Sequence, residues 1–393
     1  MDFVLDIVGL GTSLFSYLIP FVFVLTVVVF FHELGHFAVA RYFGTRIDVF
    51  SIGFGREIFG WYDRHGTRWR VSWIPLGGYI KFFGDAGASS APDREALQKQ
   101  AEQLSEEERK ACFHFKPLGQ RAAIVAAGPI ANFILAIVIL AFIFGTFGEV
   151  VLTPRIDSIR PGGAAEQAGL QVGDVIVKVD GKTIATFSDL QRVVSISAET
   201  PLLITVNRFN QLFDLTVTPE RGEITDRFGN VHKVGLLGIE RNMAPEDVER
   251  VRYGPLAAIG KGVTETWFVI ERTFVYLGRI IVGKEEANQL GGPLRIAQIS
   301  GQVASLGFVP LINLTAILSV SIGLINLFPI PMLDGGHLLY YGYEAIAGRP
   351  LNARAQEYGF RIGLALVLCL MVFATWNDLV QLAIFNGLFG TLY

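Results

Sequence analysis

Two histidines near the start of the chain have the spacing of metal ligands. They lie in the run His32–His36 (HELGH), and residues four apart share one face of a helix. Both imidazoles can therefore reach one metal ion. Glu33 follows His32 directly, where its carboxylate can take a proton from a water molecule that zinc has activated. The pattern predicts a hydrolytic zinc site with His32 and His36 as ligands and Glu33 as general base.

A catalytic zinc site usually has three protein ligands and one open position. The residues directly after His36 offer no donor on the same face of the helix, and the nearest acid and histidine, Asp48 and His65, lie in loop sequence. A better candidate is Asp334. We expect Asp334 to be the third ligand, although it could instead cap the helix that follows it.

Asp334 lies in a run that breaks a long apolar segment, NLFPIPMLDGGH at 326–337. Pro329 and Pro331 remove helix donors and kink or unwind the chain, and Gly335 and Gly336 permit close backbone approach. A carboxylate on broken helix at membrane depth is costly, so it usually has a functional role.

Four segments are long and apolar enough to cross the hydrocarbon of a bilayer, which takes about 20 residues. They span about 14–39, 121–147, 308–332 and 360–386. The sequence therefore predicts four transmembrane helices, the first at 1–40 with the histidine pair, the second at 121–148, and the third and fourth within 306–393. The first segment lacks the early positive charges and cleavage site of a signal peptide, so we expect it to be retained.

The segment 41–120 is predicted to hold a membrane-associated β-hairpin. Residues 68–73 alternate as a strand does, and Pro75, Gly77 and Gly78 then predict a break. The charged stretch 92–111 favours a solvated helix. Several arginines lie close to the predicted spans in 41–120, and further ones lie between the third and fourth spans, so both loops should be cytoplasmic.

A soluble β-rich domain is predicted at 150–240. Short β-branched runs at 175–179, 202–207 and 212–217 alternate with turns such as Asp180-Gly181, and 164–168 is a helix closed by Gly169. The next region, 241–305, is amphipathic and interfacial in our interpretation; whether 256–282 is interfacial or spanning stays open. The net charge of −3 argues against a nucleic-acid partner, and two cysteines are too few for a disulfide framework.

Taken together, HELGH on the first span and NLFPIPMLDGGH on a later one resemble the site-2 protease family of M50-type intramembrane zinc metalloproteases. The pieces GPIANF (128–133) and GGPLRIA (291–297) also match, and AAEQAGLQVGDVIVKVDG (164–181) resembles the PDZ domain of the bacterial RseP-like branch. The resemblance implies an α-helical polytopic membrane protein with an inserted PDZ domain. It departs from the well-studied RseP-like proteins, which carry two PDZ units, since the sequence has room for one.

The resemblance also implies roles for particular residues. His32, His36 and Asp334 would bind Zn²⁺, and Glu33 would be the catalytic base. Asn326 would position the substrate strand or the oxyanion, although a helix–helix hydrogen bond explains it equally well. The hairpin at 53–83 would pair with an unwound substrate as an added strand.

The implied substrates are single-span transmembrane proteins in a bacterial inner membrane, such as an anti-sigma factor or a signal-peptide remnant. The active site would lie near the cytoplasmic side, in contact with lipid, and the PDZ domain would be periplasmic. The alternative functions are a catalytically inactive membrane-anchored PDZ scaffold and a metal-ion transporter. A transporter would need more intramembrane acids, and the second and fourth spans hold only Asp378.

Overall fold

The computed structural model describes residues 2–84, 104–225, 231–241, 249–283, 287 and 291–381. The chain divides into two compact units, each with its own hydrophobic core. The first unit comprises Met1–Leu140, Gly262–Ile270 and Leu290–Tyr393, and the second comprises Ala141–Lys261 and Glu271–Gln289.

Helices build most of the first unit. They are α1 (Asp2–Tyr42), α3 (Glu106–Ala111), α4 (Leu118–Thr146), α8 (Pro293–Ala304), α9 (Phe308–Asn326), α10 (Asp334–Ala347) and α11 (Ala353–Gln381). Four of them contain a stretch that is long and apolar enough to cross a membrane: Phe15–Tyr42, Leu118–Thr146, Phe308–Asn326 and Arg354–Val380. These stretches overlap the four predicted spans and confirm them by length and composition.

The third span is shorter than predicted. Helix α9 ends at Asn326 with Leu327 as its C-cap, rather than continuing to residue 332. Pro329 and Pro331 follow, and neither can supply an amide hydrogen to continue a helix. The chain re-enters a helix only at Asp334. The last residues of the predicted fourth span, 382–386, lie outside the described residues, as does most of the solvated helix predicted at 92–111. The described part of that prediction contains α3, which begins after its N-cap, Ser105.

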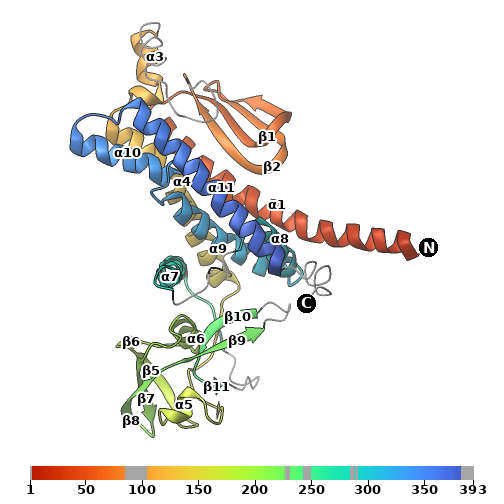
Figure 1. Ribbon diagram of the computed structural model, residues 1–393, viewed down its shortest axis with the longest axis vertical. Coiled ribbons are helices and arrows are strands. Elements are labelled where there is room, and N and C mark those ends of the chain that lie inside the picture. Colours follow the sequence, from red (N-terminus) through yellow and green to blue (C-terminus); the bar gives the residue numbers. More distant parts are fainter. Residues whose placement is uncertain are drawn as a thin grey trace. The chain divides into compact units, whose positions relative to one another are not determined.

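A folded sheet lies along one side of α1 (Figure 1). Its strands are β1 (Ile47–Tyr62) and β2 (Arg68–Phe82). Residues 57–62 pair with 68–72. Residues 47–52 pair with 78–82 on one side and, over 49–52, with 68–71 on the other. The predicted break at Pro75–Gly78 is wrong as a strand end, because β2 continues through it. The chain bends there instead: Gly77 has φ of +112°, which L side chains rarely adopt.

Aromatic side chains hold this sheet against α1. Phe50 is fully buried; its ring stacks on Trp69 with centroids 4.3 Å apart and meets Phe37 of α1 edge-on at 5.5 Å. The same core includes Ile124 of α4 and Phe113 from the short 3-10 helix η1 (Phe113–Phe115). Residues of α1, the sheet and α4 therefore share one hydrophobic core.

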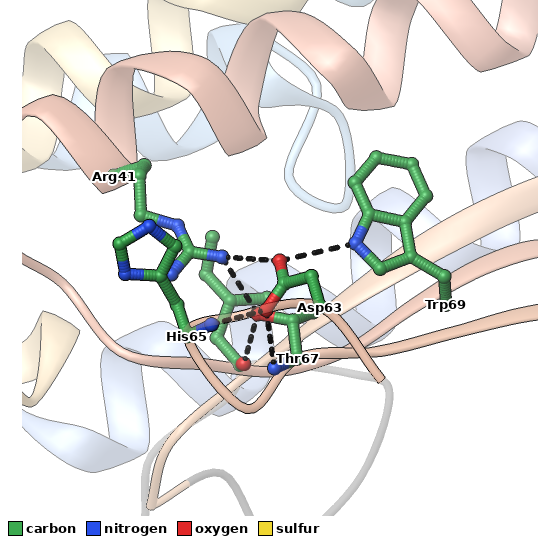
Figure 2. A network of polar contacts seen from close by, with 6 residues as sticks. Arg41, Asp63, His65, Thr67 and Trp69 are labelled. Atoms are coloured by element: carbon green, nitrogen blue, oxygen red, sulfur yellow. Dashed lines mark hydrogen bonds and ion pairs between the residues drawn. The ribbon is translucent and has the colours of Figure 1, made fainter. Parts of the chain in front are cut away.

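A polar network fixes the turn of the hairpin to the end of α1 (Figure 2). Arg41 donates to Asp63 Oδ2 at 2.7 Å and to Thr67 Oγ1 at 2.9 Å. Asp63 also accepts hydrogen bonds from the main-chain N–H groups of His65 and Thr67 and from Trp69 Nε1. Arg41 lies five residues after His36, so this network links the sheet to the helix that carries both histidines.

The second unit is β-rich, as predicted (Figure 1). Its main sheet has the order β6-β5-β7-β8, formed by Lys182–Thr183, Val175–Val179, Leu202–Arg208 and Gln211–Val217. The predicted turn at Asp180-Gly181 is confirmed by positive φ values of 48° and 77°. Helices α5 (Ala164–Gln167) and α6 (Phe187–Ser195) pack with the sheet around a core that includes Ile176, Leu190 and Ile204.

Shorter strand pairs complete this unit. They are β4 (Ser158–Ile159) with β11 (Ile239–Glu240), β9 (Glu220–Thr225) with β10 (Val231–Leu236), and β3 (Glu149–Val151) with β12 (Glu249–Val251). Because β12 pairs with β3, the unit extends beyond the predicted 150–240 at both ends.

Helix α7 (Pro255–Ile281) forms where an amphipathic segment was predicted. Exposed apolar side chains recur along it at steps of three, four or seven residues, at Leu256, Ile259, Val263, Trp267 and Phe274. It is not among the four candidate spans. Its position at a membrane interface stays a prediction.

Candidate metal centre

The structure brings the three predicted zinc ligands together, although 298 residues (334 − 36) separate His36 from Asp334. One donor atom from each of His32, His36 and Asp334 lies within 4.8 Å of the others. The two imidazole Nε2 atoms are 3.2 Å apart. Asp334 Oδ2 lies 3.2 Å from His32 Nε2 and 3.4 Å from His36 Nε2. The three atoms thus form a nearly equilateral triangle.

These spacings fit a tetrahedral zinc ion. Ligand atoms at about 2.0–2.1 Å from zinc in that geometry are separated by about 3.3 Å. Asp334 Oδ2 is buried and lies near the two imidazole nitrogens, but it makes no hydrogen bond of proper geometry within the described part of the chain. A buried carboxylate oxygen without a hydrogen bond is costly. The donor set and its spacing therefore suit the metal that the sequence predicts.

Asp334 does not cap the next helix, which was the alternative reading. The N-cap of α10 is Leu333, and Asp334 is the first residue of the helix. Its carboxylate points to the histidines of α1 instead. Gly335 and Gly336 make this possible: a Cβ on either would lie 2.3–2.4 Å from main-chain atoms of residues 327–330. The tight turn after the two prolines therefore depends on both glycines.

Helix α4 packs closely against both histidines. A Cβ on Gly128 would lie 2.2 Å from His36 Nε2 and 2.9 Å from His32 Cε1. A Cβ on Gly35 would lie 2.2 Å from the Ala127 carbonyl oxygen. Glycine at both positions lets α1 and α4 pack with the imidazole rings between them.

Helix α4 also contacts the far side of both imidazole rings. His36 Nδ1 lies 2.8 Å from the Ile124 carbonyl oxygen, and His32 Nδ1 lies 3.3 Å from Asn132 Nδ2. The segment GPIANF (128–133) matches the family motif, but that match predicts no role for Asn132. The available signal was an amide side chain in an otherwise apolar span.

Glu33 lies beside the sheet and opens onto a cavity of about 680 Å³. A Cβ on Gly78 of β2 would lie 3.4 Å from Glu33 Cγ. The cavity is also lined by the three candidate ligands, by residues 78–80 of β2 and by Asn326. Its volume is typical of ligand sites. A general base, a metal centre and a strand therefore share one cavity.

Asn326 lies at the C-terminal end of α9. Its Nδ2 donates to the Ile322 carbonyl oxygen at 3.0 Å, within its own helix. This contact differs from the helix–helix hydrogen bond considered above, and it leaves the amide at the cavity wall. A role of Asn326 in positioning substrate stays a prediction.

The other candidate donors lie elsewhere. Asp48 is 3.6 Å from Arg46, and His65 belongs to the turn network of Figure 2. Asp378 of α11 is buried and accepts hydrogen bonds from the main-chain N–H groups of Gly292 and Arg295. It therefore binds the N-terminus of α8, where an acidic group is favoured. This contact accounts for Asp378 without an ion pathway.

Comparison with known proteins identifies the family. Residues 20–370 match Peptidase family M50. A protein of Rhizobium meliloti whose name places it among zinc metalloproteases is 49% identical over 376 residues, which cover 95% of this chain and 98% of that protein. Metalloprotease MmpA of Caulobacter vibrioides is 41% identical over 391 residues, with 95% and 98% covered.

A solved PDZ domain matches a short part of the chain. The PDZ domain of HtrA3, bound to a phage-derived ligand, is 28% identical over 18% of this chain and 86% of that domain, with a TM-score of 0.14. A score this low carries no argument about the fold.

The family match and the two long relatives confirm the resemblance to M50-type proteases and the prediction of a zinc enzyme. The chain belongs to peptidase family M50 and is a multi-pass membrane zinc metalloprotease.

Proposed function

We propose that the protein cleaves transmembrane segments of single-span membrane proteins, with His32, His36 and Asp334 as zinc ligands and Glu33 as general base. The main support for this proposal is the location of these four residues. His32 and Glu33 lie within a stretch, Phe15–Tyr42, that is apolar enough to span a membrane, and His32 is only 8% exposed. A polar cluster at such a position is expensive unless it has a function.

The sheet supplies a means of presenting the substrate. Residues 78–82 of β2 pair with 47–52 on one side, and no other strand among the described residues pairs with them. This edge lies next to Glu33. A helix hides its peptide groups in its own hydrogen bonds, so a substrate must unwind before cleavage, and an unwound segment can add to a free strand edge.

The chemistry then divides between the metal and the chain. His32, His36 and Asp334 would hold the zinc ion, which would supply Lewis acidity toward water and toward a peptide carbonyl. Glu33 takes a proton from the attacking water and can return it to the leaving nitrogen. The cavity gives water access to the site. Asn326 at the cavity wall is placed to hold the substrate strand or the developing negative charge.

The second unit is proposed to be a single PDZ domain on the extracytoplasmic side of a bacterial inner membrane. The support is the sequence of residues 164–181 and the positive charge of the loops that flank the spans. The active site would then lie near the cytoplasmic side. Anti-sigma factors and signal-peptide remnants are the proposed substrate classes.

A cleavage assay in liposomes tests this proposal. Full-length protein is reconstituted with a single-span substrate, and products are mapped by mass spectrometry, with Glu33→Gln as the matched variant. We expect cuts within the apolar segment for the wild type and a loss of at least 10²-fold for Glu33→Gln, while zinc stays bound. Equal cleavage by both would refute the role of Glu33, and cuts only outside the apolar segment would refute intramembrane proteolysis.

The same vesicles distinguish the alternative functions. An inactive scaffold predicts no cleavage by the wild type, and a transporter predicts zinc flux into sealed vesicles that His32→Ala abolishes. Trapping with Glu33→Gln, which should hold uncut substrates, would then identify the natural substrates.

A further inference from the structure

Helix α4 places one amide side chain directly behind the metal centre. Asn132 is completely buried. Its main-chain oxygen accepts a hydrogen bond from Ser319 of α9 at 2.8 Å, and a Cβ on Gly323 would lie 3.1 Å from Asn132 Cβ. The main chain and Cβ of Asn132 are therefore held by α9, while its amide group faces His32.

His36 shows how a hydrogen-bond partner on α4 fixes which ring nitrogen carries the proton. His36 Nδ1 lies 2.8 Å from the Ile124 carbonyl oxygen. A carbonyl oxygen only accepts hydrogen bonds, so Nδ1 must carry the proton of a neutral ring. The lone pair is then on Nε2, which is the atom that faces His32 and Asp334. A main-chain group thus fixes the tautomer that can bind metal.

His32 has the same requirement. Its Nε2 also faces the other two donor atoms, so a zinc-binding ring must keep its proton on Nδ1. The atom 3.3 Å from His32 Nδ1 is Nδ2 of Asn132. Asn132 Oδ1 is buried and has no hydrogen-bond partner among the described residues. Rotation of the amide by 180° about Cβ–Cγ exchanges Oδ1 and Nδ2 and brings this acceptor to Nδ1.

We propose that Asn132 is the positioning residue for His32: its Oδ1 accepts a hydrogen bond from Nδ1–H and thereby keeps the Nε2 lone pair directed at the metal. Helix α4 then orients both histidines, His36 through the Ile124 carbonyl and His32 through the Asn132 amide. The inference rests on the proposed ligand role of His32.

Zinc affinity of the full-length protein in detergent tests this role. It is measured by competition with a chelator for the wild type, Asn132→Leu and Asn132→Asp. Loss of such a partner typically weakens metal binding by about 10–100-fold. We expect Asn132→Leu to fall in that range and Asn132→Asp to stay close to the wild type, because a carboxylate accepts the same hydrogen bond.

A purely structural role of Asn132 predicts the reverse order. A buried carboxylate without a donor would be the more damaging change, and leucine the milder one. Undiminished affinity in Asn132→Leu, or an equal loss in both variants, would overturn the proposal. Asn132→Ala, which removes the acceptor without adding bulk, gives the same test if the leucine variant does not fold.

Two further variants separate the possible causes. Ser321→Ala is a control in α9 that removes only a hydrogen bond to the Ile317 carbonyl oxygen, and it should leave zinc affinity unchanged. His32→Ala tests the assumption beneath the proposal. If His32→Ala binds zinc as the wild type does, the ligand assignment fails. If only His32→Ala weakens binding, the assignment stands and the role of Asn132 is refuted.

Discussion

Gly128→Ala should weaken zinc binding, although alanine favours α4, the helix in which residue 128 lies. Alanine in the interior of a helix is about 1 kcal/mol more favourable than glycine, so α4 itself gains. The added Cβ, however, would lie 2.2 Å from His36 Nε2, 2.5 Å from His36 Cε1 and 2.9 Å from His32 Cε1. Normal contact needs about 3.5 Å, so the rings or the helices must separate by about 1 Å.

A displacement of this size is large compared with the site. The donor atoms are only 3.2–3.4 Å apart, and metal–ligand distances tolerate about 0.2 Å. We therefore expect zinc affinity to fall by at least about 10-fold and cleavage by about 10²-fold or more. Chelator competition, substrate cleavage and thermal unfolding in detergent measure the three quantities.

Gly119→Ala is the matched control. It makes the same change in the same helix, at a position where a Cβ meets nothing within 4 Å, and should keep zinc and activity. If Gly128→Ala bound zinc and cleaved substrate like this control, the close packing of α4 on the histidines would not be a requirement of the metal centre, and the reasoning would be wrong.

Two further predictions concern the hairpin turn of the first unit and the second unit. Arg41→Ala should free the turn in Figure 2, raising hydrogen exchange of residues 63–67 and lowering kcat/KM with zinc content unchanged; unchanged exchange would contradict the role of the network. Asp174, in the second unit, is buried and accepts two hydrogen bonds from Arg208, at 2.7 and 2.8 Å. Burial alone would raise the pKa of Asp174, but the bonds from Arg208 and from the main-chain N–H of Gln171 hold it below its usual value. Asp174→Asn should therefore destabilise this unit by about 2 kcal/mol at neutral pH. A carboxylate with a lowered pKa stabilises the fold at pH values above its unfolded pKa of about 3.9, and this stabilisation is lost as the pH falls through its folded pKa. The difference in unfolding temperature between wild type and Asp174→Asn should therefore be constant from about pH 5 to 8 and shrink below about pH 4. A difference that grows as the pH falls would contradict this prediction.

The chemistry of the site could be predicted because its signals are local. The spacing of His32 and His36 follows from the geometry of one helix, and prolines around Asp334 mark broken helix whatever surrounds it. The pairing of Asp334 with the histidines required more than spacing. It came from the absence of a nearer donor and from the family resemblance, and the structure places the three side chains together.

The contacts behind the histidines could not be predicted. Helix α4 is apolar around most of its circumference, so its sequence carries no periodicity that shows which face meets α1. The rotational phase of α4 about its own axis decides whether Gly128 and Asn132 lie beside the histidines. Such phase is set by packing between helices distant in sequence, which a single sequence does not display.

The sheet shows a second limit. Pro75, Gly77 and Gly78 are local signals for a strand end, yet β2 continues because residues 78–82 find a partner in 47–52. Tertiary pairing thus overrides local preference. The end of α9 shows the opposite case: the apolar run was extended to residue 332, whereas the prolines that follow Asn326 end the helix.

The zinc content of Asp334→Ala tests the central claim most directly. Asp334 is the ligand that joins α10 to α1, and its assignment depends most on the structure. Purified full-length wild type should contain about one zinc ion per chain. Asp334→Ala, folded by its thermal unfolding, should lose zinc to a chelator that leaves the wild type loaded. A variant that retained zinc as tightly as the wild type would contradict a metal centre built from His32, His36 and Asp334.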